Sequence, residues 1–556
     1  MPRKAKSKFI DPTRAVSRSL RQRLRNSYYD TFLYRRVLKG AHPVQIKFNP
    51  KNHWGGDVAV ADALFRGQYT FAGHTVSAPN ENPWRLQAPS QAWLDELHGF
   101  SWLRHFRAQG GDAAKRHVEV LIKKWLQDFH DWDPVAWQPE VIAHRLIAWM
   151  SNASMAVSTQ DLVHHSAVMN SMARQARHLA RTAPTARDGL PRLLALIGLI
   201  YSGFCLPEGA RRLSKGLQLL ERELDRLVLA DGCIVTRNPS DQYEALKALV
   251  ALKADLKAAS QDMPNYIQRA IDRMAPMLRF FRLGDSKLAL FNGSFEESVE
   301  ELDQVLDAAK AQGKPLGGAI YSGFQRVQAG QTIVLMDAGS PPPGDLSISA
   351  HASANSFEMS VGAERLIVNC GSSDEILYDG LHKVSRTTAA HSTLIIDNKN
   401  SFPILDNQRI GKRPKKVLAV RDEMDDTVGL DITHYGYVTA FGYEHERILK
   451  VARSGKVIEG IDALKSVNRK KRPKSPIDIR FHLHPGVEAR RTVDGGAVEL
   501  TLPSGALWRF ESTHGVNVEE SLYLGERGHV ERTRQLVVSG TSGAPRLQIN
   551  WRLLKI

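Results

Sequence analysis

Residues 351–370, HASANSFEMSVGAERLIVNC, and residues 386–401, RTTAAHSTLIIDNKNS, decide how the second half of the chain is interpreted. Two runs, Ser356–Ser360 and Arg365–Cys370, alternate apolar with polar side chains, which is typical of β-strands. A glycine follows each run and indicates a turn. This region is therefore predicted to contain antiparallel β-structure.

Two histidines, His351 and His391, frame this region and are forty residues apart. A histidine beside each of two strands can bring two imidazoles to one side of a sheet. Imidazole exchanges protons near neutral pH and binds metal ions, so the pair is a candidate for either chemistry. An ordinary place at two strand ends is the alternative that spacing alone leaves open.

The first half of the chain has a helical pattern. Apolar residues recur at intervals of three and four in the segments Trp93–Phe106, Ala114–Phe129, Val141–Met150, Leu162–Leu179, Arg192–Phe204, Ala210–Leu229, Tyr243–Leu256 and Tyr266–Phe281. Such helices need a closed arrangement to bury their apolar stripes, and the pattern allows a bundle, a solenoid or a toroid. We find no repeat of fixed period, which argues against a solenoid.

Beyond residues 313–318 the pattern changes to short alternating runs separated by Gly, Asp-Gly and Pro, which predicts an antiparallel β-sandwich. We therefore expect an α+β multidomain protein. Its predicted parts are a basic leader at residues 1–45, a helical domain at 46–312 and a β-domain at 313–556.

The net charge of +16 is concentrated in the leader, where residues 1–40 hold twelve Lys or Arg and two Asp. The leader has no apolar run of secretory-signal length. Between residues 13 and 38, arginines alternate with apolar residues at helical spacing, which indicates a basic amphipathic helix. Such a helix suits an anionic membrane surface or a solvated extension, and nucleic acid is a weaker alternative.

The cysteines and the hydropathy of the chain bear on its redox compartment and on whether it spans a membrane. The three cysteines, Cys205, Cys233 and Cys370, form no C-x-x-C pair and no disulfide framework, so a reducing compartment is allowed. The most apolar run, Leu193–Pro207, is shorter than the roughly 20 residues that span a bilayer. No membrane-spanning helix is therefore expected.

The stretch from residue 351 to residue 401 resembles the C-terminal β-domain of the heparinase II/III-like polysaccharide lyase family, whose segments read H-A-D-x-x-S-F and R-x-T-x-A-H-N-T. The resemblance covers most of residues 45–556, and the order of its short motifs makes it specific. They include Asp337–Gly339, His434–Tyr437, Glu459–Asp462 and Phe481–Pro485. The resemblance implies an incomplete (α/α) toroid followed by an antiparallel β-sandwich. It also implies β-elimination of a uronic-acid-containing polysaccharide, the activity of a carbon–oxygen lyase.

The chain departs from this family where the toroid supplies catalytic groups. In the family, an Asn-His pair engages the substrate carboxylate and a Tyr acts as acid and base. Those positions correspond here to Leu190, Pro191 and Asp241, none of which preserves the family's group. A tyrosine follows at Tyr243, but on a helix it is rotated by about 200° from Asp241.

The candidate catalytic residues that the resemblance leaves are His351, His391, Tyr243 and Arg237. Arg237 is a candidate because a guanidinium pairs bidentately with a carboxylate, although a structural arginine is the alternative. The candidate substrate-binding residues are Asn238, Arg386, Trp84, Trp137, His105 and Arg145. Aromatic faces and forked donors suit sugar rings, whereas Asn238 followed by proline is also typical of a helix start.

Some members of the family hold zinc in the β-domain with His, Asp and His. The corresponding residues here are His351, Asn369 and His391, and a neutral amide is a weak zinc ligand. No cofactor is therefore expected, with zinc at these three residues as the alternative.

Two main hypotheses about function follow. The first is a lyase-like enzyme that acts on an acidic polysaccharide with an altered catalytic set; the second is a non-catalytic binder of an envelope or capsule glycan. A glycoside hydrolase using Asp241 with Glu140 or Glu444 is a weaker third. The resemblance implies the cell envelope or periplasm, whereas the leader suggests the cytoplasm or the inner-membrane surface. The sequence does not indicate the oligomeric state.

Overall fold

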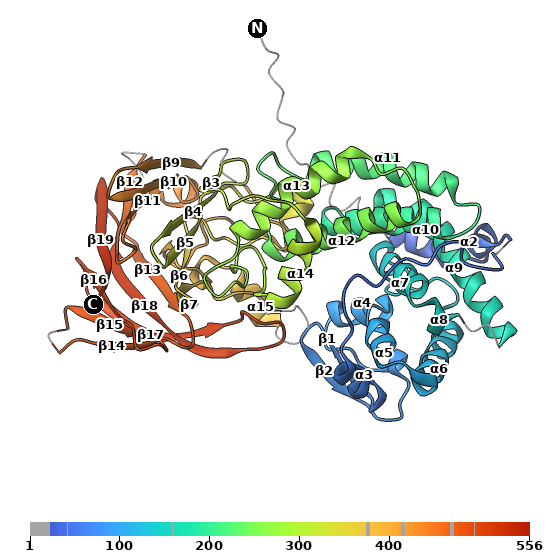
Figure 1. Cartoon of the computed structure of the whole chain (residues 1–556). Helices are drawn as coiled ribbons and strands as arrows, with labels where there is room; N and C mark the ends of the chain where they lie inside the picture. The colour runs from blue at the N-terminus through green and yellow to red at the C-terminus, as the bar shows by residue number, and fades with distance from the viewer. Residues whose placement is uncertain are drawn as a thin grey trace, which may run out of the picture.

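The computed structural model describes residues 23–41, 43–157, 161–373, 379–412, 417–467, 472–493 and 495–556. Helices form one part of the molecule and strands form the other, and the two parts lie side by side (Figure 1). The predicted leader helix therefore falls in part, at residues 13–22, outside the described residues. No helix among the described residues is long and apolar enough to cross a membrane.

The helical part follows the predicted periodicity closely. Its helices are α2 (Phe32–Leu38), α3 (Val58–Phe65), α4 (Gln91–Gly99), α5 (Leu103–Gln109), α6 (Gly111–Phe129), α7 (Pro139–Ser151), α8 (Ala153–Ala156), α9 (Leu162–Thr182), α10 (Leu190–Cys205), α11 (Ala210–Leu227), α12 (Pro239–Ala258), α13 (Asn265–Phe280) and α14 (Val299–Ala309). The predicted segment Trp93–Phe106 is two helices, because Phe100 is left-handed at the end of α4. A short hairpin, β1 (Gln68–Phe71) and β2 (His74–Ser77), was not predicted.

Helix α10 is the centre of the helical part and packs against α7, α11 and α12. It is apolar on most sides, as a helix surrounded by other helices must be. Gly198 permits this approach, because a Cβ atom at that position would lie 2.3 Å from the Cβ of Ala143 on α7.

The β part consists of two antiparallel sheets. The outer sheet has the order β14 (Glu488–Arg491), β15 (Ala497–Thr501), β16 (Leu507–Ser512), β19 (Arg546–Lys555), β12 (Val457–Ser466), β11 (Tyr443–Ala452), β10 (Thr427–His434) and β9 (Leu418–Glu423). The inner sheet has the order β17 (Val516–Tyr523), β18 (Glu531–Thr541), β13 (Pro476–Leu483), β7 (Glu364–Val368), β6 (Phe357–Val361), β5 (Thr332–Asp337), β4 (Phe324–Ala329) and β3 (Gly318–Ala319), with β8 (Leu394–Ile396) also on β13. The sandwich predicted from alternation is confirmed.

The core between the sheets combines stacked aromatic rings with one buried ionic group. Trp551 of β19 stacks on Phe357 and Phe510, with interplanar angles of 6° and 18°. Its indole N–H donates to Asp462 at 2.8 Å, and the same carboxylate accepts hydrogen bonds from Arg447. Because the charges are opposite and the polar atoms are bonded, this group can be buried without the cost of an isolated ion.

The two parts of the molecule are joined by a buried ion pair between Arg237 and Asp337. Arg237 precedes α12 in a left-handed conformation (φ 58°), and its guanidinium contacts the Asp337 carboxylate at the end of β5. Its Nε donates to the Ser322 carbonyl at 2.7 Å, and its guanidinium carbon lies 4.3 Å from the centre of the Phe324 ring. Both side chains are almost fully buried, so each charge depends on the other.

Replacing Asp337 with Asn tests this role, because it leaves the Arg237 guanidinium buried without its counter-charge. We expect the free energy of unfolding to fall by about 3–5 kcal/mol, the usual cost of breaking a buried ion pair. Chemical denaturation followed by circular dichroism measures this. Glu488→Gln breaks the exposed pair with Arg490 and should cost less than about 1 kcal/mol. Equal losses in the two variants would contradict the assignment.

Candidate functional site

His351 and His391 meet in the β part, as their positions beside predicted strands suggested. The Nδ1 atom of His351 lies 3.0 Å from the Nε2 atom of His391, and the rings are nearly perpendicular. Both side chains are buried. His351 lies in the segment before β6 and His391 in the segment before β8. The sheet therefore brings two residues that are forty positions apart in the sequence into contact.

The hydrogen bonds of the pair define its protonation. The Nδ1 atom of His391 lies 2.7 Å from the Thr387 carbonyl, which can only accept, so this nitrogen carries the proton. In neutral His391 the Nε2 atom then accepts, and the proton between the rings belongs to Nδ1 of His351. The Nε2 atom of His351 is left with a lone pair, and it has no hydrogen-bond partner among the described residues.

Burial keeps both imidazoles neutral. It lowers the pKa of His391 to about 4, although the Thr387 carbonyl opposes the shift. Burial, with the neighbouring His391 and Arg386, lowers the pKa of His351 well below its usual value. The arrangement is therefore a neutral base with one unpaired nitrogen, held in a fixed tautomer by a second ring.

One asparagine connects this pair to the start of α12 in the helical part. The His351 backbone N–H donates to the Asn292 side chain at 3.2 Å, and the Asn292 amide donates to the Arg237 carbonyl at 3.0 Å. The next residue, Asn238, caps α12 by accepting from the Ser240 backbone N–H at 2.8 Å. The histidine pair and the first turn of α12 therefore lie on the two sides of the same boundary.

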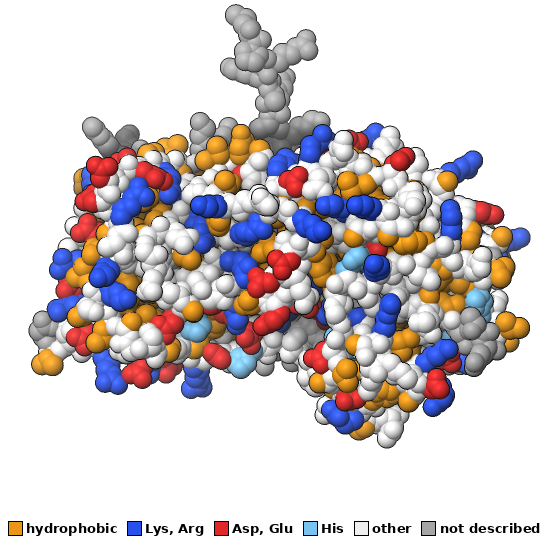
Figure 2. Space-filling model, viewed as in Figure 1, with side chains coloured by type: hydrophobic (Ala, Val, Ile, Leu, Met, Phe, Trp, Pro, Cys, Tyr) orange, Lys and Arg blue, Asp and Glu red, His pale blue; other side chains and the backbone are white. Residues whose placement is uncertain are grey.

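Asp241, in that first turn, was expected as the residue at the family's tyrosine position and as one carboxylate of the weaker glycoside hydrolase alternative. Its side chain is partly exposed, and burial raises its pKa to about 6, against the opposing effects of the Thr236 hydroxyl and Arg527. On the face shown in Figure 2, acidic and basic side chains lie among one another where the helical and β parts meet. A carboxyl group with this pKa exchanges protons near neutral pH. The signal in the sequence was an acidic residue two positions after the proline of the Asn-Pro helix start.

The structure places Tyr243 and Arg237 away from this role. The Tyr243 hydroxyl donates to Glu301 at 2.7 Å and accepts from Lys247 at 2.8 Å, and its ring is buried between α12 and α14. Burial and the charge of Glu244 raise its pKa. Arg237 is committed to Asp337, so the structural alternative for this arginine is the one observed.

Arg386 and Asn238 also have structural contacts. The Arg386 guanidinium donates to the carbonyls of Ala350, Ser347 and Gln408, and its side chain is 1% exposed. It therefore fixes the backbone that leads into His351 rather than reaching a substrate. Asn238 is the N-cap of α12, as expected from the proline that follows it.

The predicted groove residues of the helical part lie mainly in its core. Trp84 donates to the Leu121 carbonyl at 3.0 Å and Trp137 donates to the Phe129 carbonyl at 3.1 Å, and both rings are buried. Arg145 is fully buried and donates to the His98 and Ala136 carbonyls. These three side chains do not line a groove as predicted, because they pack among apolar residues and donate their hydrogen bonds to backbone carbonyls in the core.

His105 is partly exposed, and its Nδ1 atom accepts from the Asp57 backbone N–H at 2.9 Å. It belongs to a local group with Arg104, which pairs with Glu301. Leu190 and Pro191 form the first turn of α10, and both are partly exposed. Neither side chain can donate a hydrogen bond to a substrate carboxylate.

The three residues considered for zinc do not present ligand atoms to one point. The side-chain oxygen of Asn369 accepts from the Ser392 backbone N–H at 3.1 Å. The facing nitrogens of His351 and His391 bond each other directly. Among the described residues, no group of three or more His, Cys, Asp or Glu could hold a metal ion. The donor set therefore does not fit the family's zinc site.

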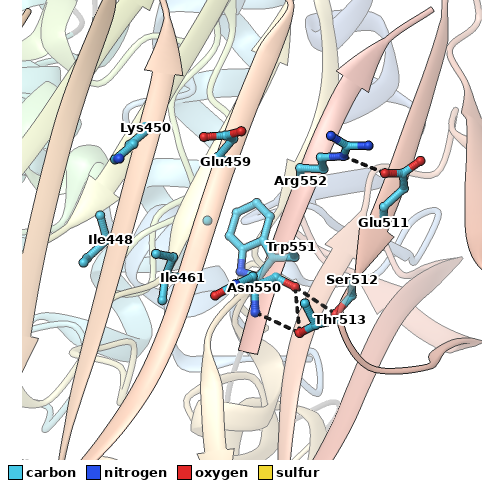
Figure 3. A pocket seen from close by; sticks show the side chains of 11 residues that line it. Ile448, Lys450, Glu459, Ile461, Glu511, Ser512, Thr513, Asn550, Trp551 and Arg552 are labelled. Carbon is cyan, nitrogen blue, oxygen red and sulfur yellow. Dashed lines mark hydrogen bonds and ion pairs between the residues drawn. The ribbon is translucent and has the colours of Figure 1, made fainter. Parts of the chain in front are cut away.

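A pocket of about 390 Å³ lies elsewhere, on the outward face of the outer sheet. Strands β11, β12, β16 and β19 line it, with Lys450, Glu459, Glu511 and Arg552 around the opening (Figure 3). Arg552 pairs with Glu511 across the strands. Because the histidine pair does not line this pocket, we place the chemistry at the boundary of the two parts.

Comparison with known proteins agrees with this architecture. Residues 311–552 match the family described as Heparinase II/III-like, C-terminal. The chain is 29% identical over 518 residues to FtsZ-localized protein C of Caulobacter vibrioides (strain NA1000 / CB15N), covering 90% of this chain and 88% of that protein.

Solved structures show the same fold. Heparinase III matches with a TM-score of 0.73 at 14% identity, covering 94% of this chain and 89% of that one. The heparan sulfate lyase HepC from Pedobacter heparinus matches with a TM-score of 0.59 at 17% identity, covering 89% and 82%. These likenesses confirm the predicted toroid followed by a β-sandwich, and the match over residues 311–552 confirms the resemblance found in the sequence.

The buried histidines predict a loss of stability in acid. Because folding depresses the pKa of His391 from about 6.5 to about 4, the stabilisation is complete above pH 6.5 and is lost as the pH falls towards 4. This one group accounts for about 3 kcal/mol. Denaturation at a series of pH values should show a shallower dependence for His391→Asn than for the unaltered chain. Identical slopes for His391→Asn and the unaltered chain would refute the protonation assigned here.

Proposed function

We propose, taking residues 311–552 as a heparinase II/III-like C-terminal domain, that the chain is a polysaccharide lyase-like protein that cleaves an acidic, uronic-acid-containing glycan by β-elimination. The observation that carries this proposal is the unpaired Nε2 atom of His351, a neutral base whose tautomer is fixed by His391. A neutral imidazole nitrogen with a lone pair can accept the proton that elimination removes from the carbon beside a carboxylate.

The proposed reaction uses one residue from each side of the boundary. The Nε2 atom of His351 takes the proton from C5 of the uronate, and the C5–H electron pair forms the C4–C5 double bond. The bond from C4 to the glycosidic oxygen breaks, and the protonated carboxyl of Asp241 gives its proton to the departing oxygen. With a pKa of about 6, Asp241 is a suitable acid near neutral pH.

His391 positions and polarises the base. Its Nε2 atom accepts the Nδ1 proton of His351, which leaves the lone pair of His351 on the opposite nitrogen, Nε2. The Thr387 carbonyl holds His391 in the tautomer that this requires. The same arrangement spreads the positive charge that develops when His351 takes a proton.

A non-catalytic glycan binder is the second candidate function. It is favoured by Leu190 and Pro191 at the family's Asn-His positions and by the burial of Tyr243. The Nε2 atom of His351 is itself covered in this structure, so a glycan reaches it only when covering groups move.

The lyase proposal predicts that the chain generates unsaturated uronate from at least one polyuronate, measured by ultraviolet absorbance on a panel of such polysaccharides. His351→Gln keeps a polar side chain but removes the base, and should lower the rate by about 10²-fold or more. His529→Gln, at an exposed position, is the matched control and should keep the full rate. Glycan binding without absorbance growth in the unaltered chain would favour the binder instead.

We also propose that this activity takes place at the division site and at an anionic membrane surface. The Caulobacter relative is called FtsZ-localized, which supports the first part. The second part is supported by α2, where Tyr34 and Leu38 face the toroid while Phe32 and Leu33 are 64% and 67% exposed beside Arg35 and Arg36. Exposed apolar side chains among arginines suit an interface rich in acidic lipid.

Sedimentation with vesicles tests the membrane part. The full chain should bind vesicles containing phosphatidylserine and bind phosphatidylcholine vesicles weakly. Phe32→Ser with Leu33→Ser should reduce binding by about tenfold, because two apolar side chains no longer enter the interface. Val420→Ser, at an exposed position of β9, should have no effect. Equal binding by all three proteins would remove α2 from the proposed contact.

A further inference from the structure

The pocket on the outward face of the outer sheet has the size of a small-ligand site. Its volume is about 390 Å³, and small-molecule sites occupy roughly 300–1,000 Å³. Strands β11, β12 and β19 contribute most of its lining, and residues at the end of β16 complete it (Figure 3). The histidine pair is not among the lining residues, so the proposed elimination does not use this pocket.

Two isoleucines lie side by side in this pocket. Ile448 of β11 and Ile461 of β12 are paired in the register of the sheet, and both side chains are partly exposed. Directly paired residues of neighbouring antiparallel strands lie on the same face of the sheet. An aliphatic surface inside a hollow favours a ligand with an aliphatic group, because contact between them removes apolar area from water.

The strands that form the pocket are fixed by the core beneath them. A Cβ atom on Gly460 would lie 2.1 Å from the Trp551 indole ring, so the backbone of β12 lies directly against that ring. The indole N–H donates to the buried carboxylate of Asp462 at 2.8 Å, which holds the ring in place. The pocket is therefore formed before a ligand binds, and a preformed site loses less entropy on binding.

Two side chains of opposite charge at the opening have no counter-charge. Lys450 of β11 and Glu459 of β12 are direct cross-strand neighbours, and such neighbours commonly form ion pairs. Within the part of the chain that the structure describes, neither side chain forms an ion pair or a hydrogen bond (Figure 3). The cation on the other side of Glu459, Arg552, pairs with Glu511. One ammonium group and one carboxylate are therefore available at the same opening.

Asn550 of β19 adds a hydrogen-bond donor to the pocket. It is the cross-strand neighbour of Ile461 and so extends the row of the two isoleucines. Its side-chain oxygen accepts from the Gln548 amide at 2.9 Å, whereas its Nδ2 atom donates to no residue that the structure describes. An amide N–H in this position is suited to a carbonyl oxygen of a ligand.

We propose that this pocket binds a short zwitterionic peptide with an aliphatic side chain. The ammonium group of the peptide pairs with Glu459, and its carboxylate pairs with Lys450. The aliphatic side chain lies on Ile448 and Ile461, and the Nδ2 atom of Asn550 donates to the peptide carbonyl. This site is separate from the histidine pair, and the inference does not depend on the proposed function.

The spacing of the two charges suits a dipeptide. Direct cross-strand neighbours have Cβ atoms about 5 Å apart, and two extended residues span at most about 7 Å. An acidic glycan fits the pocket less well, because it carries carboxylates but no ammonium group. It would leave Glu459 unpaired and close to a second negative charge.

Isothermal titration of the full chain with three matched probes tests the proposal. The probes are alanyl-leucine, the same dipeptide with its amino group acetylated, and the same dipeptide with its carboxylate amidated. Each blocked form lacks one of the two charges. The free dipeptide should therefore bind about fivefold more tightly than either blocked form, the difference expected for one partly exposed charge-assisted contact.

Variants of the two charged residues assign each charge of the peptide to its partner. Glu459→Gln should weaken binding of the free dipeptide about fivefold without weakening binding of the acetylated form, which has no ammonium group. Lys450→Gln should likewise weaken the free dipeptide but not the amidated form. Ile461→Ser should weaken all three probes, because each has the leucine side chain. Glu488→Gln, on β14 of the same sheet, is the matched control and should bind as the unaltered chain does.

Three results would overturn the proposal. If the free and blocked dipeptides bind equally, Lys450 and Glu459 do not recognise the charges of a peptide. If no dipeptide binds at millimolar concentration, the pocket is not a peptide site. If a polyuronate hexamer binds instead and Lys450→Gln weakens that binding, the pocket is a glycan subsite. The candidate catalytic residues His351 and Asp241 do not line this pocket, so each of these results leaves the proposed elimination to its own test.

Discussion

The buried pair of Arg237 and Asp337 is the constraint on which the relation of the two parts depends. Neither charge could remain buried alone, so the end of β5 and the start of α12 must stay together. This contact also positions the residues near Arg237 and Asp337 that belong to the candidate site. Asn238 begins α12 with Asp241 in its first turn, and Ser353 donates to Asp337 at 2.8 Å, two residues after His351. A structural ion pair thus holds the proposed base and the proposed acid on facing sides of one boundary.

The chemistry of the site comes from burial as much as from residue identity. His351 and His391 are neutral because both side chains are buried. The Thr387 backbone carbonyl fixes which nitrogen of each ring carries the proton. Asp241 is driven in the opposite direction, because burial raises a carboxyl pKa while it lowers that of an imidazole. Burial thus favours an unprotonated imidazole and a protonated carboxyl at the same pH, which an acid and a base that act together require.

Sequence patterns were sufficient to predict the architecture, because the periodicities of helices and strands reflect which side chains are buried. The contact of His351 with His391 also followed from sequence, since each histidine lies beside a strand of the same sheet. Side-chain direction did not follow. Trp84 and Trp137 were predicted to line a groove because aromatic faces suit sugar rings, yet their indole N–H groups donate to carbonyls inside the helical core.

Elimination and hydrolysis of a polyuronate differ in the bond that is broken and in whether water is consumed. The most direct measurement is mass spectrometry of the products formed when the full chain is incubated with a polyuronate hexamer. Because elimination consumes no water, we expect the masses of each pair of fragments to sum to the mass of the hexamer, with a double bond in the new non-reducing end. Fragments that together are heavier by one water would show hydrolysis and contradict the proposed roles of His351 and Asp241.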